Sequence, residues 1–287
     1  MNTALPTAVG FPAPLLGSEA LRLPVLAASA GALVLDKPAG VAWEAVTGGV
    51  ATQAAAGKPE LLAFGLRGQI VAVWPLDAAV SGPLLLAERG ERSARWRNAF
   101  GSEQLEFVFE LLATGDAAGD SAAGGGDVFE CALPVAWHRD GSRALVSNTT
   151  GKKARTLFRR IARAGTGTAA ARWSWWEART RYPRPDQIRL HAAECGLRLA
   201  GETLYAAGDA ITLESLATRG RVNKGVPRPL HDGLVLRLAR VLEVPPDTTG
   251  DSKSSAAGDA LFAGILPLFA PEPPRTNVLR RRLADSG

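Results

Sequence analysis

The alternation of apolar and polar positions is clearest in the segment LEFVFEL, residues 105–111. Leu and Phe occupy every second position there, and two glutamates lie between them. A repeat of two residues is typical of a β-strand with one buried face. Segments 32–35, 69–74 and 234–244 also favour short strands, because each is apolar and is followed by residues that form turns or break strands.

Helical patterns are short and few. Residues 186–195 predict a helix, with Asp186 placed to cap its N-terminus and Gly196 placed to end it. Residues 212–218 predict a second short helix. The apolar pattern of residues 152–163 fits a helix and a strand equally well, so its secondary structure stays open. Many short strands with few helices indicate an α+β fold with a mixed or antiparallel sheet.

The composition is typical of a globular protein. Of the 287 residues, 46% are apolar, which is enough for one large core or two small ones. The two cysteines, Cys131 and Cys195, lack CxxC spacing and the three histidines are scattered, so neither a disulfide nor a metal site is indicated. The N-terminal segment has no basic start and no cleavage site of the secretory kind, and we therefore expect a cytoplasmic protein.

The net charge of +5 is unevenly distributed. Between residues 151 and 189 the chain has eleven Lys or Arg and two acidic residues, a local charge of +9 that leaves −4 for the remainder. Aromatic residues are interleaved with this basic block, among them Trp173, Trp175, Trp176 and Tyr182. Such a block suits a nucleic acid, because guanidinium groups pair with phosphates and rings stack on bases. A solvated face over core tryptophans explains it equally well.

Asp77 is the only ionisable side chain between Arg67 and Glu88. Residues 71–88 form a mostly apolar run around Asp77. The carboxylate, two prolines and Gly82 argue against a membrane span, so we interpret this run as a buried strand, a turn and a strand. An Asp beside a turn commonly caps or solvates a loop. Apolar flanks instead favour a working acid, base or nucleophile that is held by a cation from elsewhere in the chain.

Five fragments occur in an informative order. They are LVLDKPAG (33–40), PLDAAVSGPLLLA (75–87), EFVFELLATG (106–115), GKKARTLFRRI (151–161) and RPDQIRLHAAECGLRLAGETLYA (184–206). Together they resemble the RluA-type pseudouridine synthase family. Its members have a strand ending in KPAG, an HRLDxxTSGLLL segment, a KxYxALVxG strand, a GKxAxT segment and a GRTHQIRVHL helix followed by GDxLYG. The resemblance extends from about residue 33 to residue 244.

The resemblance implies roles for individual residues. Asp77 corresponds to the catalytic aspartate and Arg189 to the arginine that forms an ion pair with it. Phe109 corresponds to the aromatic residue beside the target base, where the family usually has Tyr. The Lys37–Gly40 motif is expected to be structural, and Glu202 replaces the Asp of GDxLY.

The chain departs from the family around the proposed site. Trp74 and Pro75 replace the family's His-Arg, Val80 replaces a Thr, and GRTHQIR has become PRPDQIR at residues 183–189. Trp74 is either a wedge in the space that the base leaves or a buried core residue.

The resemblance also implies the fold and the activity. We expect an α+β, pseudouridine-synthase-like fold, with a mixed, largely antiparallel β-sheet and flanking short helices. The expected divisions are an N-terminal extension (1–30), a catalytic domain (31–245), a linker (246–260) and a peripheral C-terminal tail (261–287). The implied protein is an isomerase that converts uridine to pseudouridine in rRNA or tRNA. It is expected to be a cytoplasmic monomer that needs no cofactor or metal and does not associate with a membrane.

Two other classes stay open. The first is a non-catalytic RNA-binding member of the same fold with a degenerate site. The second is an unrelated metabolic enzyme or a protein-binding scaffold.

Overall fold

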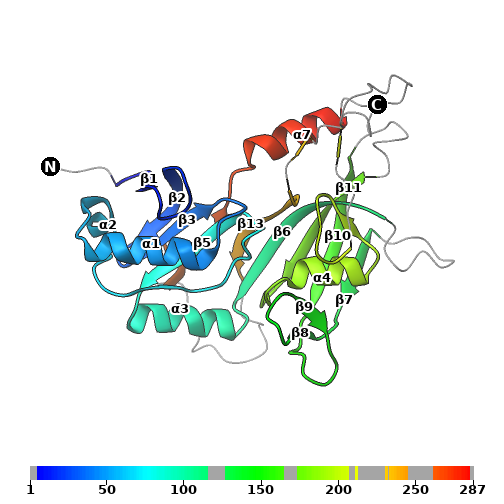
Figure 1. The fold of residues 1–287 in the computed structure, drawn as a ribbon. Coiled ribbons are helices and arrows are strands. Elements are labelled where there is room, and N and C mark those ends of the chain that lie inside the picture. The colour runs from blue at the N-terminus through cyan, green and yellow to red at the C-terminus, as the bar shows by residue number, and fades with distance from the viewer. Residues whose placement is uncertain are drawn as a thin grey trace. The chain divides into compact units, whose positions relative to one another are not determined.

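The computed structural model of the protein describes residues 5–115, 127–164, 173–206, 211–212, 230–231, 233–244 and 261–284. The chain forms two compact units (Figure 1). Unit 1 contains Met1–Phe107 and Leu238–Ala270, and unit 2 contains Val108–Arg237 and Pro271–Gly287. Each unit is therefore assembled from segments that are distant in sequence.

Unit 1 contains a five-stranded antiparallel sheet in the order β1-β2-β3-β5-β4. Its strands are β1 (Ala8–Phe11), β2 (Leu21–Ser29), β3 (Ala32–Lys37), β4 (Ile70–Ala72) and β5 (Gly82–Glu88). Both β3 and β5 are buried along almost their whole length. Burial on both faces explains why their sequences are continuously apolar and do not alternate.

The described part of unit 1 also contains α1 (Trp43–Ala55), α2 (Pro59–Ala63), α3 (Glu91–Gly101) and a short strand pair. Helix α1 packs against β4 and α2, and α3 packs against β5. Strand β13 (Leu236–Glu243) enters unit 1 at Leu238 and pairs with β14 (Leu268–Phe269).

Unit 2 contains strands in the order β6-β11-β10-β7. These are β6 (Leu105–Thr114), which begins in unit 1, β7 (Val128–Cys131), β10 (Thr156–Arg163) and β11 (Trp173–Thr180). The short β12 (Arg198–Leu199) pairs with β6, and β8 (Val135–Trp137) pairs with β9 (Ala144–Val146). Helix α4 (Gln187–Glu194) packs against β9 and β12.

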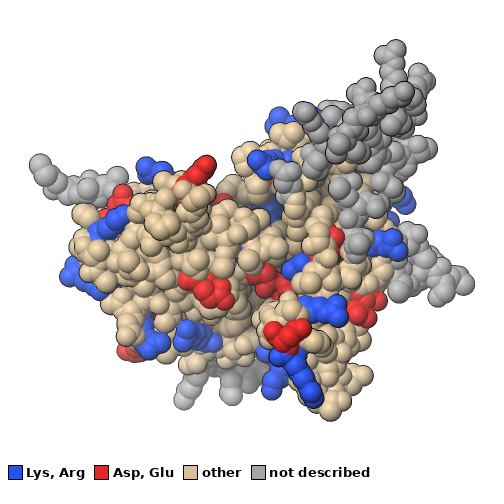
Figure 2. All heavy atoms as spheres, viewed as in Figure 1, with Lys and Arg blue, Asp and Glu red and all other residues tan. Residues whose placement is uncertain are grey.

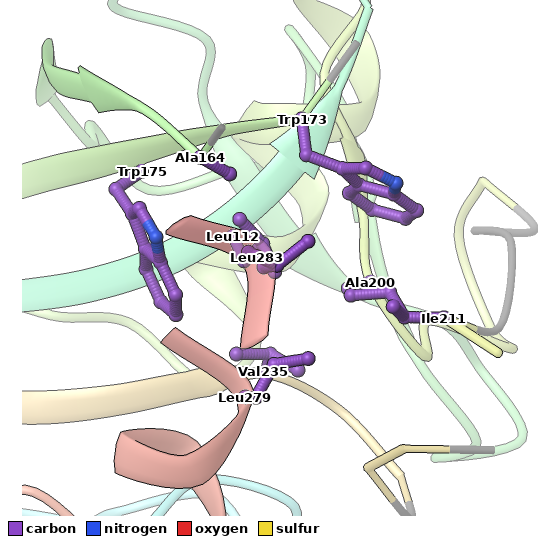
Figure 3. Close-up of a cluster of buried hydrophobic side chains, with 9 residues drawn as sticks. All are labelled: Leu112, Ala164, Trp173, Trp175, Ala200, Ile211, Val235, Leu279 and Leu283. Carbon is purple, nitrogen blue, oxygen red and sulfur yellow. The ribbon is translucent and has the colours of Figure 1, made fainter. Parts of the chain in front are cut away.

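The C-terminal helix α7 (Pro274–Ala284) is part of a buried hydrophobic cluster in unit 2. Figure 3 shows this cluster, in which Leu279 and Leu283 of α7 lie near Trp175, Leu112 and Val235. Leu279 and Leu283 are four residues apart, so they share one face of the helix, and both are fully buried. The expectation of a peripheral tail is therefore wrong for residues 274–284.

The α+β fold class and the mostly antiparallel pairing are confirmed. Strands β3, β4, β6 and β13 confirm the four predicted strands, and the open segment 152–163 contains β10. The predicted linker 246–260 lies outside the described residues, as does the predicted helix 212–218 apart from Thr212. The division at residues 30, 245 and 260 stays a prediction.

Helix α4 confirms the helix predicted at 186–195, and Gly196 follows it with a φ of +84°. Asp186 occupies the N-cap position, but it has a left-handed backbone (φ 55°) and makes no side-chain capping bond. The predicted cap is wrong because the Asp186 carboxylate is bonded to Arg189 and Tyr205 instead.

Replacing Leu283 by Ala should lower the free energy of unfolding by about 2–5 kcal/mol, because a fully buried side chain is removed from the cluster around Trp175. The measurement is urea unfolding followed by tryptophan fluorescence. Val278→Ala, in the same helix but half exposed, is the matched control and should change stability little. Equal losses in both variants would contradict the buried position of α7.

Candidate active site

Asp77 lies in the loop of unit 1 that connects β4 to β5. The side chain is partly exposed, whereas Leu76 and Val80 on either side of it are buried. A tight turn forms here, since the Val80 N–H donates to the carbonyl of Asp77 at 3.0 Å. The predicted arrangement of strand, turn and strand is confirmed, and it presents one carboxylate between buried apolar neighbours.

The loop of the KPAG motif is bonded to the Asp77 loop. The carbonyl oxygen of Ala78 accepts hydrogen bonds from the Gly40 N–H at 2.7 Å and from Lys37 Nζ at 3.3 Å. Gly40 has a φ of +87°, a conformation that favours glycine. The motif therefore has a definite structural task, which is to position the residue next to Asp77.

Lys37 is fully buried, although it is a lysine. Its ammonium also donates to the carbonyls of Pro38 (3.0 Å) and Val41 (2.8 Å). Burial lowers the pKa of Lys37 from 10.5 to about 8, and the negative charge of Asp77 is the largest of the influences that oppose the shift. Lys37 is thus a cation in the electrostatic neighbourhood of Asp77.

Ser81 and Gly82 are positioned by strand β13. The Leu238 N–H donates to the Ser81 carbonyl at 2.8 Å. Gly82 has a φ of +130°, and a Cβ there would lie 2.3 Å from the Leu238 carbonyl oxygen. Only glycine allows the two backbones to approach so closely, which explains the Ser-Gly pair after Asp77.

Trp74 is a core residue. It is 1% exposed, its Nε1 donates to the Pro83 carbonyl at 3.1 Å, and its ring meets Phe107 edge-on at 5.2 Å between centroids. The interpretation as a wedge for a displaced base is wrong, because the indole is already enclosed by protein. Trp74 instead joins the chain before the Asp77 loop to the start of β5.

Arg189 lies on α4 in unit 2 and binds two carboxylates there. Its Nε and Nη2 donate to both oxygens of Glu202 at 2.8 and 2.7 Å, and its Nη1 donates to Asp186 at 2.9 Å. Burial alone would lower the pKa of Arg189, but the bonds and charges of the two carboxylates outweigh this effect and raise the pKa. The three bonds use three of the five N–H hydrogens of a guanidinium, which leaves capacity for a further acceptor.

The two partners of Arg189 are themselves held in place. Glu202 accepts hydrogen bonds from the backbone N–H groups of Thr203 and Leu204 at 2.9 and 2.7 Å. Asp186 accepts one from the Tyr205 hydroxyl at 2.8 Å, and that hydroxyl in turn accepts the Ala144 N–H at 2.9 Å. The GETLY turn and the DQIR segment therefore form one hydrogen-bonded network.

Gln187 anchors the start of α4, a role that sequence reasoning missed. Its Oε1 accepts the Arg184 N–H at 2.8 Å, and its Nε2 donates to the Arg155 carbonyl and to Thr156 Oγ1, both at 3.0 Å. The side chain joins α4 to β10, and it is buried. Gln187 is identical to the Gln of the family's QIR motif, and this identity was the signal in the sequence. The spacing of residues did not indicate a role for the side chain.

The three predicted site residues are divided between the units. Asp77 belongs to unit 1, whereas Arg189 and Phe109 belong to unit 2. Phe109 is buried in β6 with 4% of its surface exposed. The predicted pairing of Asp77 with Arg189 and the role of Phe109 beside a base stay predictions.

The basic block is less available to a nucleic acid than its composition indicates. Trp173, Trp175 and Trp176 are at most 3% exposed, so they are core residues and not stacking platforms. Several arginines also have acidic partners: Arg155 pairs with Glu130, Arg159 and Arg179 with Glu177, and Arg160 with Asp127. On the face seen in Figure 2, blue and red atoms are accordingly interspersed.

Within the described segments, no cluster of three or more His, Cys, Asp or Glu side chains could hold a metal ion. In the same segments no helix has both the length and the apolar character of a membrane span.

The fold is similar to that of a solved RNA pseudouridylate synthase domain protein. The solved human RNA pseudouridylate synthase domain containing 4 is similar with a TM-score of 0.58 and 13% identity, over 91% of this chain and 92% of that chain. The human RNA pseudouridylate synthase domain containing 1 has a TM-score of 0.49 and 16% identity, over 91% of this chain and 94% of that one. No protein-family model and no curated protein matches the sequence.

The stability of the wild-type protein should rise relative to that of Lys37→Met between about pH 8 and pH 10.5. In this window the unfolded chain binds a proton at residue 37 that the folded chain has released, so folding is favoured as the pH increases. The slope of the difference is at most about 1.4 kcal/mol per pH unit. Urea unfolding of both proteins at several pH values measures it. Lys152→Met, at an exposed lysine, is the control, and equal pH dependence of wild type and Lys37→Met would contradict the burial of the ammonium.

Glu202→Gln should cost roughly 3 kcal/mol of stability at pH 7, because it breaks a buried ion pair with Arg189. Burial opposes ionisation, but bonds from Arg189 and from the Leu204 and Thr203 N–H groups lower the pKa of Glu202. A lowered pKa stabilises the fold above pH 4.5, and this contribution is lost as the pH falls further. The difference from wild type in urea unfolding should therefore shrink below pH 4.5. Glu194→Gln, at the exposed end of α4, should show no such convergence.

Proposed function

We propose that the protein is an RNA pseudouridine synthase, an isomerase that converts uridine to pseudouridine in rRNA or tRNA. The observation that carries the proposal is the position of Asp77. It lies on the β4–β5 loop between the Lys37–Gly40 motif and the Gly82 contact, in a fold that is similar to a pseudouridylate synthase domain over 91% of the chain.

In this proposal the Asp77 carboxylate acts on the ribose of the target uridine. It either attacks the ribose or removes the 2′ proton, after which the base turns and rejoins through carbon. Arg189 uses its remaining N–H capacity to bind and orient Asp77, and Phe109 packs beside the base. A target base inside an RNA helix must be extruded before the carboxylate can reach it. The reaction needs no cofactor, and the protein acts as a cytoplasmic monomer.

The alternative is an RNA-binding protein of the same fold without activity. Two observations favour it. Trp74 and Pro75 stand where the resemblance places His-Arg, and the charge of Arg189 is already balanced by Asp186 and Glu202. Both proposals include RNA binding, and they differ in the part played by Asp77.

Asp77→Asn should abolish pseudouridine formation, with a loss of at least about 10³-fold, because an amide can neither attack the ribose nor accept its proton. The substrate is total RNA from a strain that lacks the protein, and modified sites are mapped by carbodiimide labelling and primer extension. Glu60→Gln, at an exposed carboxylate of unit 1, is the matched control and should keep full activity.

RNA binding, measured over a series of salt concentrations and combined with the modification assay, separates the two proposals. If the wild-type protein binds RNA but modifies no site, the catalytic proposal is lost and the binding proposal stands. If it does neither, both are lost.

A further inference from the structure

A second group of reactive side chains lies on the face of α4 that carries His191. His191 is fully buried, and its Nδ1 lies 2.9 Å from Thr156 Oγ1 while its Nε2 lies 2.8 Å from the Leu133 carbonyl. Thr156 is the partner of Cys131 in the pairing of β10 with β7, and Leu133 follows Cys131 by two residues. The imidazole therefore contacts both the residue that faces Cys131 across the sheet and the carbonyl two residues after Cys131.

Cys195 lies one helical turn beyond His191. Its N–H donates to the His191 carbonyl at 3.1 Å, so the two residues lie on the same face of α4 at its C-terminal end. Cys131 is buried and Cys195 is partly exposed, and both are free thiols. The chain thus brings together two cysteines that are 64 positions apart in sequence.

The two thiols lie close enough to act on each other's ionisation. A bond from the Cys195 thiol, assisted by His191, lowers the pKa of Cys131 to about 5, whereas the same bond and burial raise the pKa of Cys195. Cys131 is therefore the more acidic thiol of the pair, and Cys195 is the thiol that reaches solvent. A thiolate in contact with a second thiol is the arrangement that thiol–disulfide exchange requires.

We propose that Cys131 and Cys195 form a reversible disulfide by exchange with low-molecular-weight disulfides such as glutathione disulfide. Cys195 transfers its proton to Cys131 and attacks one sulfur of glutathione disulfide, which releases a first glutathione thiolate. Cys131 then loses that proton and its sulfur displaces the second glutathione from Cys195. One disulfide is formed and one is reduced, so electrons and protons balance.

The proposed bond would join the end of β7 to the end of α4, the helix that carries Arg189 and Gln187. It is independent of the proposed RNA chemistry. The sequence favours no disulfide, because the spacing of the cysteines matches no motif; only the pairing of β7 with β10 and the packing of His191 bring them together.

The test is incubation of the fully reduced wild-type protein with glutathione disulfide, followed by denaturation, alkylation and intact mass measurement. The expected product is a monomer that has lost two hydrogens and takes no alkyl group, and its digest contains one peptide pair linked through residues 131 and 195. Reduction with dithiothreitol should restore two alkylation sites.

Single variants assign the two steps. Cys131→Ser should stop at a mixed disulfide with glutathione on Cys195, whereas Cys195→Ser should react at least tenfold more slowly, because Cys131 is buried. Circular dichroism verifies that each variant is folded. Two alkylatable thiols in treated wild type, a stable mixed disulfide or a disulfide between two chains would each overturn the proposal. None of these outcomes depends on pseudouridine formation, so the two proposals fail separately.

Discussion

One carbonyl oxygen, that of Ala78, joins the two loops on which the candidate site of unit 1 depends. It accepts the Gly40 N–H and the Lys37 ammonium, and it belongs to the residue next to Asp77. Lys37 is buried, so a shift of Ala78 would leave a desolvated charge with one acceptor fewer, which is costly. The backbone beside Asp77 is therefore fixed by Gly40 and by Lys37, whose buried ammonium must keep its hydrogen-bond acceptors.

The buried cations of the two units are satisfied in different ways. Lys37 is surrounded by carbonyl oxygens, which are neutral dipoles, so its positive charge is solvated but not cancelled. Arg189 is bound by two carboxylates, which outweigh its charge. A carboxylate near Lys37 thus experiences a net attraction, whereas one that approaches Arg189 also meets Asp186 and Glu202. The electrostatic support of Asp77 therefore includes Lys37, which the sequence presented only as a structural residue.

Local patterns predicted the strands and α4 because burial on one or both faces leaves a direct trace in the order of apolar residues. Three features left no such trace. The Asp186 carboxylate bonds to side chains in place of the helix end, the tryptophans of the basic block are internal, and α7 is buried by two leucines in an otherwise polar segment. Each depends on partners distant in sequence. Motif identity predicted Asp77 and Arg189 as site residues, whereas the hydrogen bonds of Lys37, Glu202 and Gln187 are visible only in the structure.

The network around Arg189 has a consequence for how this chain can change over evolutionary time. Arg189 has two partners within unit 2, Glu202 and Asp186, and these bonds join α4 to the GETLY turn. Selection for a stable α4 therefore preserves Arg189, Glu202 and Asp186 together. A lineage can alter residues beside Asp77 while the architecture persists, and 13% identity across a shared fold is compatible with such drift.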